Sequence, residues 1–280
     1  MQSHVWPRIV DGKAAVDTAE LDAIAAAGFT IARVSMVPWW QRKRPDGSWN
    51  FLAWDALYKD LLDRGVTPLF MLANPRTPAD VATIAAYCAA AAPRYPKALV
   101  ELGNEPDSPS QWPAFYPPAR TQALTPAEYW SYAKQWAQAW RSAQPGTLLA
   151  TAGTSGVDLA WQRGLVAAGA ASSGLVAAFG VHPYGEHIGP GNGPTFGEHM
   201  ETLGRMLPQE VDIWVTEYGE LNATPATVAA WLRAAADSAI PVFSWYELRD
   251  DPQPYGLLRA DLSHKSPDPY AAAQAFLHGH

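Results

Sequence analysis

Two glutamates stand at the ends of short apolar segments, where they could act together. Residues 97–102 are mostly apolar and predict a strand, and Pro106 ends it because proline has no N–H to donate to a sheet. Glu105 therefore lies at the C-terminal end of a buried strand, where α/β folds place their chemistry. Residues 211–217 predict a second strand, which ends in Glu217. Two carboxylates at two strand ends are the minimum set for glycoside hydrolysis.

Strands and helices alternate along the whole chain. The apolar patterns predict strands over residues 4–9, 30–37, 66–73, 97–102, 147–152, 175–184, 211–217 and 240–248. Capping residues and apolar periodicity predict helices over residues 17–27, 51–64, 77–92, 125–143, 158–168, 195–207, 225–237 and 270–277. Strict alternation predicts one (β/α)8 barrel, an α/β fold whose single domain spans residues 1–280. A doubly wound open sheet would need a glycine-rich phosphate turn after the first strand, and none is present.

Composition excludes several classes of protein. The 280 residues are 48% apolar and 17% charged, as expected of a globular domain, and their net charge of −7 disfavours nucleic acid or an anionic membrane as a partner. The single cysteine, Cys88, rules out a disulfide framework or a multi-cysteine zinc site and is expected to be a buried helix residue. No apolar run is long enough for a membrane span, and residues 1–8 lack the apolar core of a signal peptide. Export stays open if a leader has been removed, and a monomer is expected.

The period-2 alternation of strands predicts which side chains face the barrel interior. We assume that the candidate catalytic residue of each strand faces the interior, together with every second residue counted from it. Several polar and aromatic side chains then converge at the C-terminal end of the barrel. They are Arg33, Glu101, Glu105, His182, Tyr184, Glu217 and Trp245. A buried charge must be paired, so Arg33 is expected to pair with Glu101 or Glu217.

The segments Leu102-Gly103-Asn104-Glu105-Pro106 and Trp214-Val215-Thr216-Glu217-Tyr218-Gly219 resemble the two catalytic signatures of clan A glycoside hydrolases. The resemblance extends to Arg33, to Val181-His182-Pro183-Tyr184-Gly185, to Phe243-Ser244-Trp245-Tyr246 and to Tyr255-Gly256-Leu257-Leu258, and so covers nearly the whole chain. Within the clan the chain most resembles family 39 and the cellulase-like proteins of family 5. The chain departs from many clan members at the end of the third predicted strand, where it offers Met71, Ala73 and Asn74, and in its short first strand.

The resemblance implies a role for each matching residue. Glu105 would be the acid/base and Glu217 the nucleophile of a retaining β-glycosidase that needs no metal or organic cofactor. Asn104 would donate to the sugar 2-hydroxyl. Arg33 and Tyr184 would be partners of Glu217, and Trp245 would form the floor of the −1 subsite.

Thirteen tryptophans and 11 tyrosines are many for this length. They could form a large aromatic core, or they could stack on the apolar faces of sugar rings. Trp39, Trp40 and Trp112 lie in predicted loops on different sides of the two glutamates, which favours an open cleft and cleavage inside a β-linked oligo- or polysaccharide. If they fold inward instead, they would close a pocket suited to removing single terminal sugars. Glu247 could line a subsite, or it could be a solvent-exposed residue of a loop.

Two other functions remain as alternatives. A carbohydrate-binding barrel without catalysis would not need either glutamate, yet this chain has both. A metal-dependent barrel would need carboxylates or histidines at several consecutive strand ends, which strands three, five and eight do not supply. His182, His187 and His199 could form a metal cluster, but their spacing is irregular.

Overall fold

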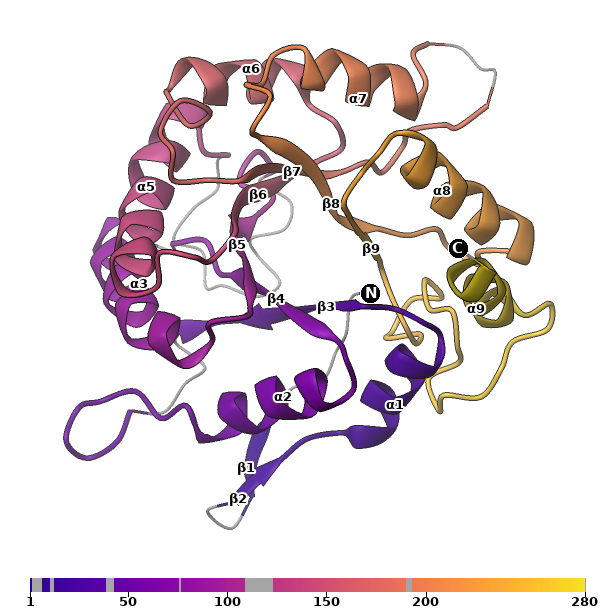
Figure 1. Ribbon diagram of the computed structural model, residues 1–280, viewed down its shortest axis with the longest axis horizontal. Coiled ribbons are helices and arrows are strands. Elements are labelled where there is room, and N and C mark those ends of the chain that lie inside the picture. Colours follow the sequence, from indigo (N-terminus) through magenta and orange to yellow (C-terminus); the bar gives the residue numbers. More distant parts are fainter. Residues whose placement is uncertain are drawn as a thin grey trace.

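The computed structural model describes residues 1, 7–10, 13–38, 43–75, 77–108, 123–189 and 193–279. Within these residues, seven parallel strands form one sheet. The strands are neighbours in the order of the sequence: β3 (Ile31–Met36), β4 (Thr67–Leu72), β5 (Leu99–Asn104), β6 (Leu149–Ser155), β7 (Ala178–His182), β8 (Asp212–Tyr218) and β9 (Val242–Trp245). β9 curls back beside β3, so the sheet forms a barrel (Figure 1). The predicted α/β barrel is confirmed.

The helices lie outside the barrel and surround it (Figure 1). They are α1 (Thr18–Ala26), α2 (Leu52–Asp63), α3 (Pro78–Ala91) with the short η2 (Ala92–Arg94), α5 (Pro126–Ala143), α6 (Leu159–Ala167), α7 (Phe196–Gly204), α8 (Pro225–Asp237) and α9 (Pro269–Gly279). α5 begins with a capping box, in which the Glu128 N–H donates to Thr125 Oγ1 and the Thr125 N–H donates to Glu128 Oε2. None of the described helices is long and apolar enough to cross a membrane.

The prediction of a first barrel strand over residues 4–9 is wrong for its described part. β1 (Arg8–Val10) pairs antiparallel with β2 (Lys13–Ala15), and this hairpin lies outside the barrel next to α2 (Figure 1). The dipeptide Asp11-Gly12 between the two strands is a strong hairpin signal, which explains the departure. Met1 lies beside β3 instead: its amine donates to the Ile31 carbonyl over 2.9 Å, and its carbonyl accepts from the Arg33 N–H over 2.7 Å.

Many of the aromatic side chains belong to the core between sheet and helices. Trp136 and Trp140 on α5 and Trp231 on α8 are fully buried. The two indoles on α5 also find acceptors, because Trp136 donates to the Val81 carbonyl and Trp140 to Thr147 Oγ1, both over 3.1 Å. Buried indole N–H groups normally need such partners. Cys88 is buried on α3, as predicted, and burial raises the pKa of its thiol.

Candidate active site

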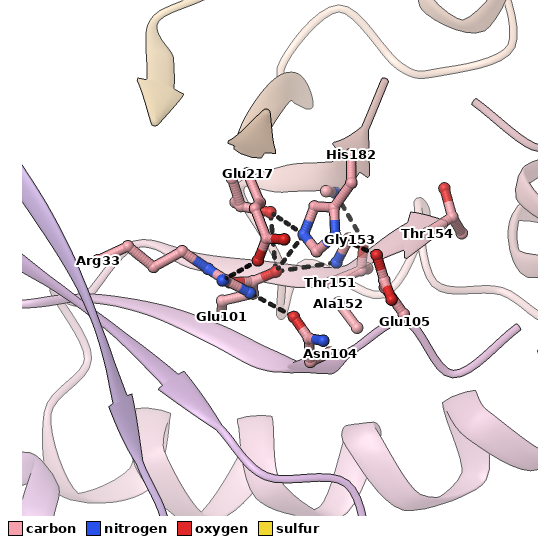
Figure 2. Close-up of polar contacts among 12 residues, drawn as sticks. Arg33, Glu101, Asn104, Glu105, Thr151, Ala152, Gly153, Thr154, His182 and Glu217 are labelled. Carbon is pink, nitrogen blue, oxygen red and sulfur yellow. Dashed lines mark hydrogen bonds and ion pairs between the residues drawn. The ribbon is translucent and has the colours of Figure 1, made fainter. Parts of the chain in front are cut away.

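Charged and polar side chains from four strands meet near the C-terminal end of the barrel (Figure 2). They are Arg33 from β3, Glu101 and Asn104 from β5, Glu105 just after β5, His182 from β7, and Thr216 and Glu217 from β8. Below them, a small apolar cluster closes off the sheet; it consists of Leu69, Ala150, Ala178, Trp214 and Val242. The polar groups are therefore removed from water on the lower side, and their charges must be balanced among themselves.

Arg33 is the cation at the centre of this cluster and is almost fully buried. Its Nε donates to Glu101 Oε2 and its Nη1 to Glu217 Oε2, each over 2.6 Å, and its Nη2 donates to Asn104 Oδ1 over 2.5 Å. Burial opposes the charge on the guanidinium, but the two carboxylates outweigh that effect and raise the pKa of Arg33. The prediction that Arg33 pairs with Glu101 or Glu217 is confirmed, and it pairs with both.

Glu101 is a fully buried carboxylate whose two oxygens accept hydrogen bonds from three groups. Oε1 accepts from the Gly153 N–H over 2.9 Å and from Thr216 Oγ1 over 2.8 Å, while Oε2 accepts from Arg33. Burial alone would raise the pKa of Glu101, yet Arg33 and His182 lower it to about 2. Glu101 is therefore ionised at neutral pH and acts as a structural counterion.

Glu217 lies at the edge of the cluster that remains partly open, with its side chain 14% exposed. Tyr184 donates its hydroxyl to Glu217 Oε1 over 3.0 Å, and Arg33 occupies Oε2. Burial and the nearby Glu217 charge both raise the pKa of Tyr184, so its hydroxyl keeps its proton and stays a donor. The two donors hold the carboxylate in one orientation.

Glu105 is only 2% exposed, and its backbone adopts a left-handed conformation with φ of 41°. Such a φ is unusual for a residue other than glycine and persists only where surrounding contacts hold it. Here the Glu105 N–H donates to the Gly153 carbonyl over 2.8 Å. The Asn74 amide brackets the preceding residue, because its Oδ1 accepts from the Asn104 N–H over 3.1 Å and its Nδ2 donates to the Asn104 carbonyl. The turn thus aims the Glu105 carboxylate into the site.

His182 is fully buried and contacts both Glu105 and Thr216. Its Nδ1 lies 3.0 Å from Glu105 Oε1 (Figure 2). Its Nε2 lies 3.1 Å from Thr216 Oγ1. Burial disfavours charge on the imidazole, but Glu217, Glu101 and Glu105 outweigh that effect and raise the pKa of His182 to about 9.

Glu105 and Glu217 face each other at close range. One carboxylate oxygen of each, together with a ring nitrogen of His182, lie within 4.8 Å of one another. Such a set could span a metal ion. However, Arg33 already supplies a cation to Glu217, and His182 is directed at Glu105. The site thus offers its own cationic groups, Arg33 and His182, to these two carboxylates.

The three histidines whose irregular spacing disfavours a metal cluster lie apart from one another. His187 contacts the Gly189 carbonyl and His199 contacts Glu186, each over 2.7 Å, whereas His182 lies in the barrel interior. Within the described ranges, the three imidazoles are not brought together as a group that could hold a metal ion.

The predicted substrate-binding aromatics have different outcomes. Trp39, Trp40 and Trp112 lie outside the described residues. Trp245 and Glu247 are fully buried, and the Trp245 ring packs edge-on against Tyr218 with 5.7 Å between ring centroids. Neither side chain presents an exposed face in this conformation, so contact between Trp245 or Glu247 and a sugar stays a prediction.

Strict alternation along the strands fails near the site. Asn104 and Glu105 both reach it although they are consecutive, because the backbone turns with positive φ at Gly103 and Glu105. Thr216 and Glu217 are also consecutive, and the pairing of β8 with β9 shifts register between Val215 and Tyr218. Sequence reasoning therefore missed Thr216. A bulge leaves no signature in a period-2 pattern.

The charges in the site predict how stability depends on pH. The pKa of His182 is raised to about 9 in the folded protein, so its contribution is complete below about 6.5, the value for a free imidazole, and is lost as pH rises through 9. Glu101 has its pKa lowered to about 2, so its contribution is complete above its ordinary value near 4.5 and is lost as pH falls toward 2. For these two groups we expect maximal stability between these limits.

Urea unfolding at a series of pH values measures this dependence. His182→Asn should flatten the curve on the alkaline side and weaken the dependence on the acid side without removing it, because Arg33 still lowers the pKa of Glu101 when His182 no longer does. His199→Asn is the matched control because its partner, Glu186, lies outside the cluster. An unchanged alkaline slope in His182→Asn would contradict the assignment of charge to His182.

Comparisons with known proteins bear on the fold. No protein-family model matches the chain, and no curated protein matches it in sequence. Solved structures match it over most of its length. A family 39 glycoside hydrolase from Bacteroides cellulosilyticus is 20% identical with a TM-score of 0.70, and covers 93% of this chain and 60% of its own.

Two further solved structures show the same similarity. An exo-β-1,4-mannosidase from an Opitutaceae bacterium is 19% identical with a TM-score of 0.66, covering 94% of this chain and 55% of its own. An endo-β-1,4-glucanase from Xanthomonas axonopodis is 14% identical with a TM-score of 0.67, covering 94% of this chain and 91% of its own. The chain thus has the barrel fold of glycoside hydrolases, and it spans about 60% of the length of the family 39 structure.

Proposed function

We propose that this chain is a retaining β-glycosidase in which Glu217 is the nucleophile and Glu105 the acid/base. The observation that carries the proposal is the approach of the two carboxylates, with one oxygen of each within a 4.8 Å set that also contains His182. Retaining enzymes place their carboxyl groups about 5–5.5 Å apart, whereas inverting enzymes leave about 6.5–9.5 Å for a water molecule. The close approach favours the first geometry.

The two carboxylates have surroundings suited to different roles. Arg33 and Tyr184 hold Glu217 as an oriented anion that can attack the anomeric carbon. Glu105 is enclosed, and among the described residues its Oε2 has no hydrogen-bond partner, so that oxygen is available to the glycosidic oxygen. In the first step, the Glu105 proton passes to the leaving oxygen as the C–O bond breaks and Glu217 bonds to the sugar. In the second, Glu105 takes a proton from water, whose oxygen displaces Glu217.

Asn104 is suited to hold the substrate. Its Oδ1 accepts from Arg33, which leaves the amide Nδ2 as the group that can donate to a sugar hydroxyl. A hydrogen bond to the 2-hydroxyl strengthens as charge develops on the sugar ring in the transition state. The contact with Arg33 also fixes the orientation of the amide without a substrate present.

A panel of aryl β-glycosides tests the activity, and proton NMR of the first product tests its stereochemistry. Retention gives the β-anomer first, because two displacements at the anomeric carbon restore the configuration. The α-anomer as first product would contradict the proposed mechanism. Binding of sugars without hydrolysis of any glycoside would favour the non-catalytic barrel.

The mode of attack is a finer question within this proposal. The loop residues Trp39, Trp40 and Trp112 favour several sugar rings bound in a row and cleavage inside a chain. The low exposure of Glu105, 2%, favours the alternative of an enclosed site that removes terminal sugars. We keep internal cleavage as the proposal because Trp39 and Trp40 follow β3 in the sequence and Trp112 follows β5.

Internal cleavage predicts a ladder of oligosaccharides early in the digestion of a β-linked polysaccharide. Trp112→Ala should weaken binding of long oligosaccharides by about 1–3 kcal/mol, by analogy with stacking of bases on aromatic side chains, and should barely affect a short aryl glycoside. Reducing-end analysis and chromatography of early products measure the outcome. A monosaccharide as the sole early product would instead establish terminal cleavage.

A further inference from the structure

His182, on β7, is surrounded by acidic groups from β5, from the turn after β5 and from β8. Glu101 and Glu105 face it from β5 and the turn after it, and Glu217 faces it from β8 (Figure 2). Thr216, also on β8, contacts its Nε2. Arg33 approaches from β3 but is bonded to Glu101 and Glu217, and the Tyr184 hydroxyl is bonded to Glu217. Both ring nitrogens of His182 are engaged, Nδ1 with Glu105 Oε1 over 3.0 Å and Nε2 with Thr216 Oγ1 over 3.1 Å.

The hydrogen bonds determine where one imidazole proton lies. A threonine hydroxyl has a single proton to donate, and Thr216 donates it to Glu101 Oε1 over 2.8 Å. Glu101 cannot return a proton, because it is ionised and accepts from Arg33 and from the Gly153 N–H as well. Thr216 must therefore accept from His182, so Nε2 carries a proton. Glu101 Oε1 itself lies 3.5 Å from Nε2 and adds direct attraction.

The charge balance of the site determines whether His182 carries a second proton, on Nδ1. Arg33 contributes one positive charge, and Glu101 and Glu217 contribute two negative charges. With Glu105 as the neutral acid, the buried cluster is electrically neutral only if His182 is an imidazolium. Buried charges that are not balanced are costly. Nδ1 then donates to Glu105 Oε1, which agrees with their 3.0 Å separation.

We propose that His182 is a positioning residue for Glu105 that is charged at neutral pH and kept protonated by Glu101 through Thr216. The inference rests on the proposed function, because it assigns His182 a task in the reaction of Glu105. His182 donates to Oε1 and thereby leaves Oε2, which has no partner among the described residues, as the oxygen that exchanges its proton with the substrate.

This arrangement keeps the charge of the site constant during the reaction. When the leaving oxygen takes the proton of Glu105, Glu105 becomes a carboxylate while Glu217 loses its charge in the ester bond to the sugar. The negative charge therefore moves from Glu217, beside Arg33, to Glu105, beside His182. In the second step, water returns a proton to Glu105 and Glu217 becomes ionised again. A cation fixed near each carboxylate stabilises both states without rearrangement.

The packing around His182 keeps the ring in place. A Cβ atom on Gly153 would lie 2.1 Å from His182 Nε2 and 2.8 Å from Thr216 Oγ1, so only glycine leaves room for the ring. Gln162 on α6 also donates to Thr154 Oγ1 on β6 and to the Gly180 carbonyl on β7, and so ties these two strands together beside the ring. The contact with Glu105 is thus held by the barrel itself.

Nitrogen NMR of the histidine side chains tests the charge directly. A two-bond 1H–15N correlation spectrum distinguishes an imidazolium, whose two nitrogens have similar shifts, from a neutral ring, whose bare nitrogen is shifted far downfield. His182→Asn identifies the His182 signals by their loss. We expect an imidazolium at pH 7 that loses its proton near pH 9. A neutral His182 at pH 7 would overturn the inference.

Two variants of Thr216 test the path from Glu101. Thr216→Val removes the hydroxyl that connects Nε2 to Glu101, so His182 should lose its proton at a pH lower by about one unit or more. Thr216→Ser keeps the hydroxyl and should titrate as the wild type does. Glu101→Gln should have a larger effect than Thr216→Val. If Glu101→Gln does not fold, the two Thr216 variants still decide. If His182 titrates identically in Thr216→Val and in the wild type, the proposed effect of Glu101 through Thr216 is overturned.

The pH profile of kcat/KM tests the effect on Glu105. His182→Asn keeps an amide donor but removes the charge. Without this cation, the alkaline limb of the profile should move to higher pH. A purely structural hydrogen bond would be restored by asparagine and leave the limb in place, which would contradict the proposal. His199→Asn is the control.

The activity assay and the NMR measurement distinguish failure of this inference from failure of the proposed function. If wild-type protein hydrolyses glycosides but His182 is neutral, this inference fails and the proposed function stands. If the wild type hydrolyses no glycoside in the panel, the proposed function fails, and with it the role of His182 in the reaction. The NMR measurement still decides whether the histidine is charged.

Discussion

Replacing Glu217 with alanine is expected to lower kcat by on the order of 10⁴-fold or more, the size of loss that follows removal of other catalytic nucleophiles. Arg33 and Tyr184 hold this carboxylate toward the partly open side of the site, and no other described carboxylate combines such partners with such access. Steady-state kinetics on the best aryl β-glycoside of the panel measure the loss.

Two further variants make this result specific. Glu217→Gln keeps a side chain of the same shape but removes the nucleophilic oxygen anion, so it should lose nearly as much activity as Glu217→Ala. Glu210→Ala removes an exposed glutamate of the loop before β8 and should retain full activity. Circular dichroism should show that all three variants are folded. Substantial activity in Glu217→Gln would contradict the assigned role.

The second large effect is expected at Glu105, and it should depend on the leaving group. Glu105→Ala should lower kcat/KM by roughly 10²- to 10⁴-fold for a natural oligosaccharide, whose leaving oxygen needs a proton. An aryl glycoside with a strongly acidic phenol needs no such help, and its kcat/KM should fall much less. Pre-steady-state and steady-state rates over a series of substituted phenyl glycosides give the dependence.

Added azide provides an internal control for Glu105→Ala. Azide attacks the glycosyl-enzyme without a general base, so it should accelerate turnover of activated substrates and yield a β-glycosyl azide. It should have no such effect on Glu217→Ala, which cannot form the intermediate. Equal losses of Glu105→Ala on both substrate classes, with no response to azide, would exclude Glu105 as the acid/base.

The sequence alone indicated most of the candidate site, because its charged residues lie in the strands or directly after them. Arg33, Glu101 and His182 are polar residues inside otherwise apolar strands, and such residues must find partners within the barrel. That requirement predicted the contact of Arg33 with Glu101 or Glu217, and the structure contains both contacts. The alternation of strands and helices similarly predicted the barrel.

Other features depend on local geometry that a residue pattern does not encode. Thr216 reaches the site because β8 shifts its register against β9, and Asn74 reaches it by bonding to the backbone of Asn104. The hairpin of β1 and β2 replaces the expected first strand because a two-residue turn signal outweighs weak apolar alternation. Trp245 is buried against Tyr218, and whether it faces a sugar depends on contacts beyond its own strand.

The central claim is that Glu217 bonds covalently to the sugar during turnover. A 2-deoxy-2-fluoro β-glycoside with a good leaving group slows both steps but allows the intermediate to accumulate. Proteolysis and mass spectrometry of the inactivated protein should then locate one glycosyl group, on Glu217. A label on Glu105 or on any other carboxylate, or hydrolysis of a true substrate with no trapped intermediate and an inverted product, would contradict the account.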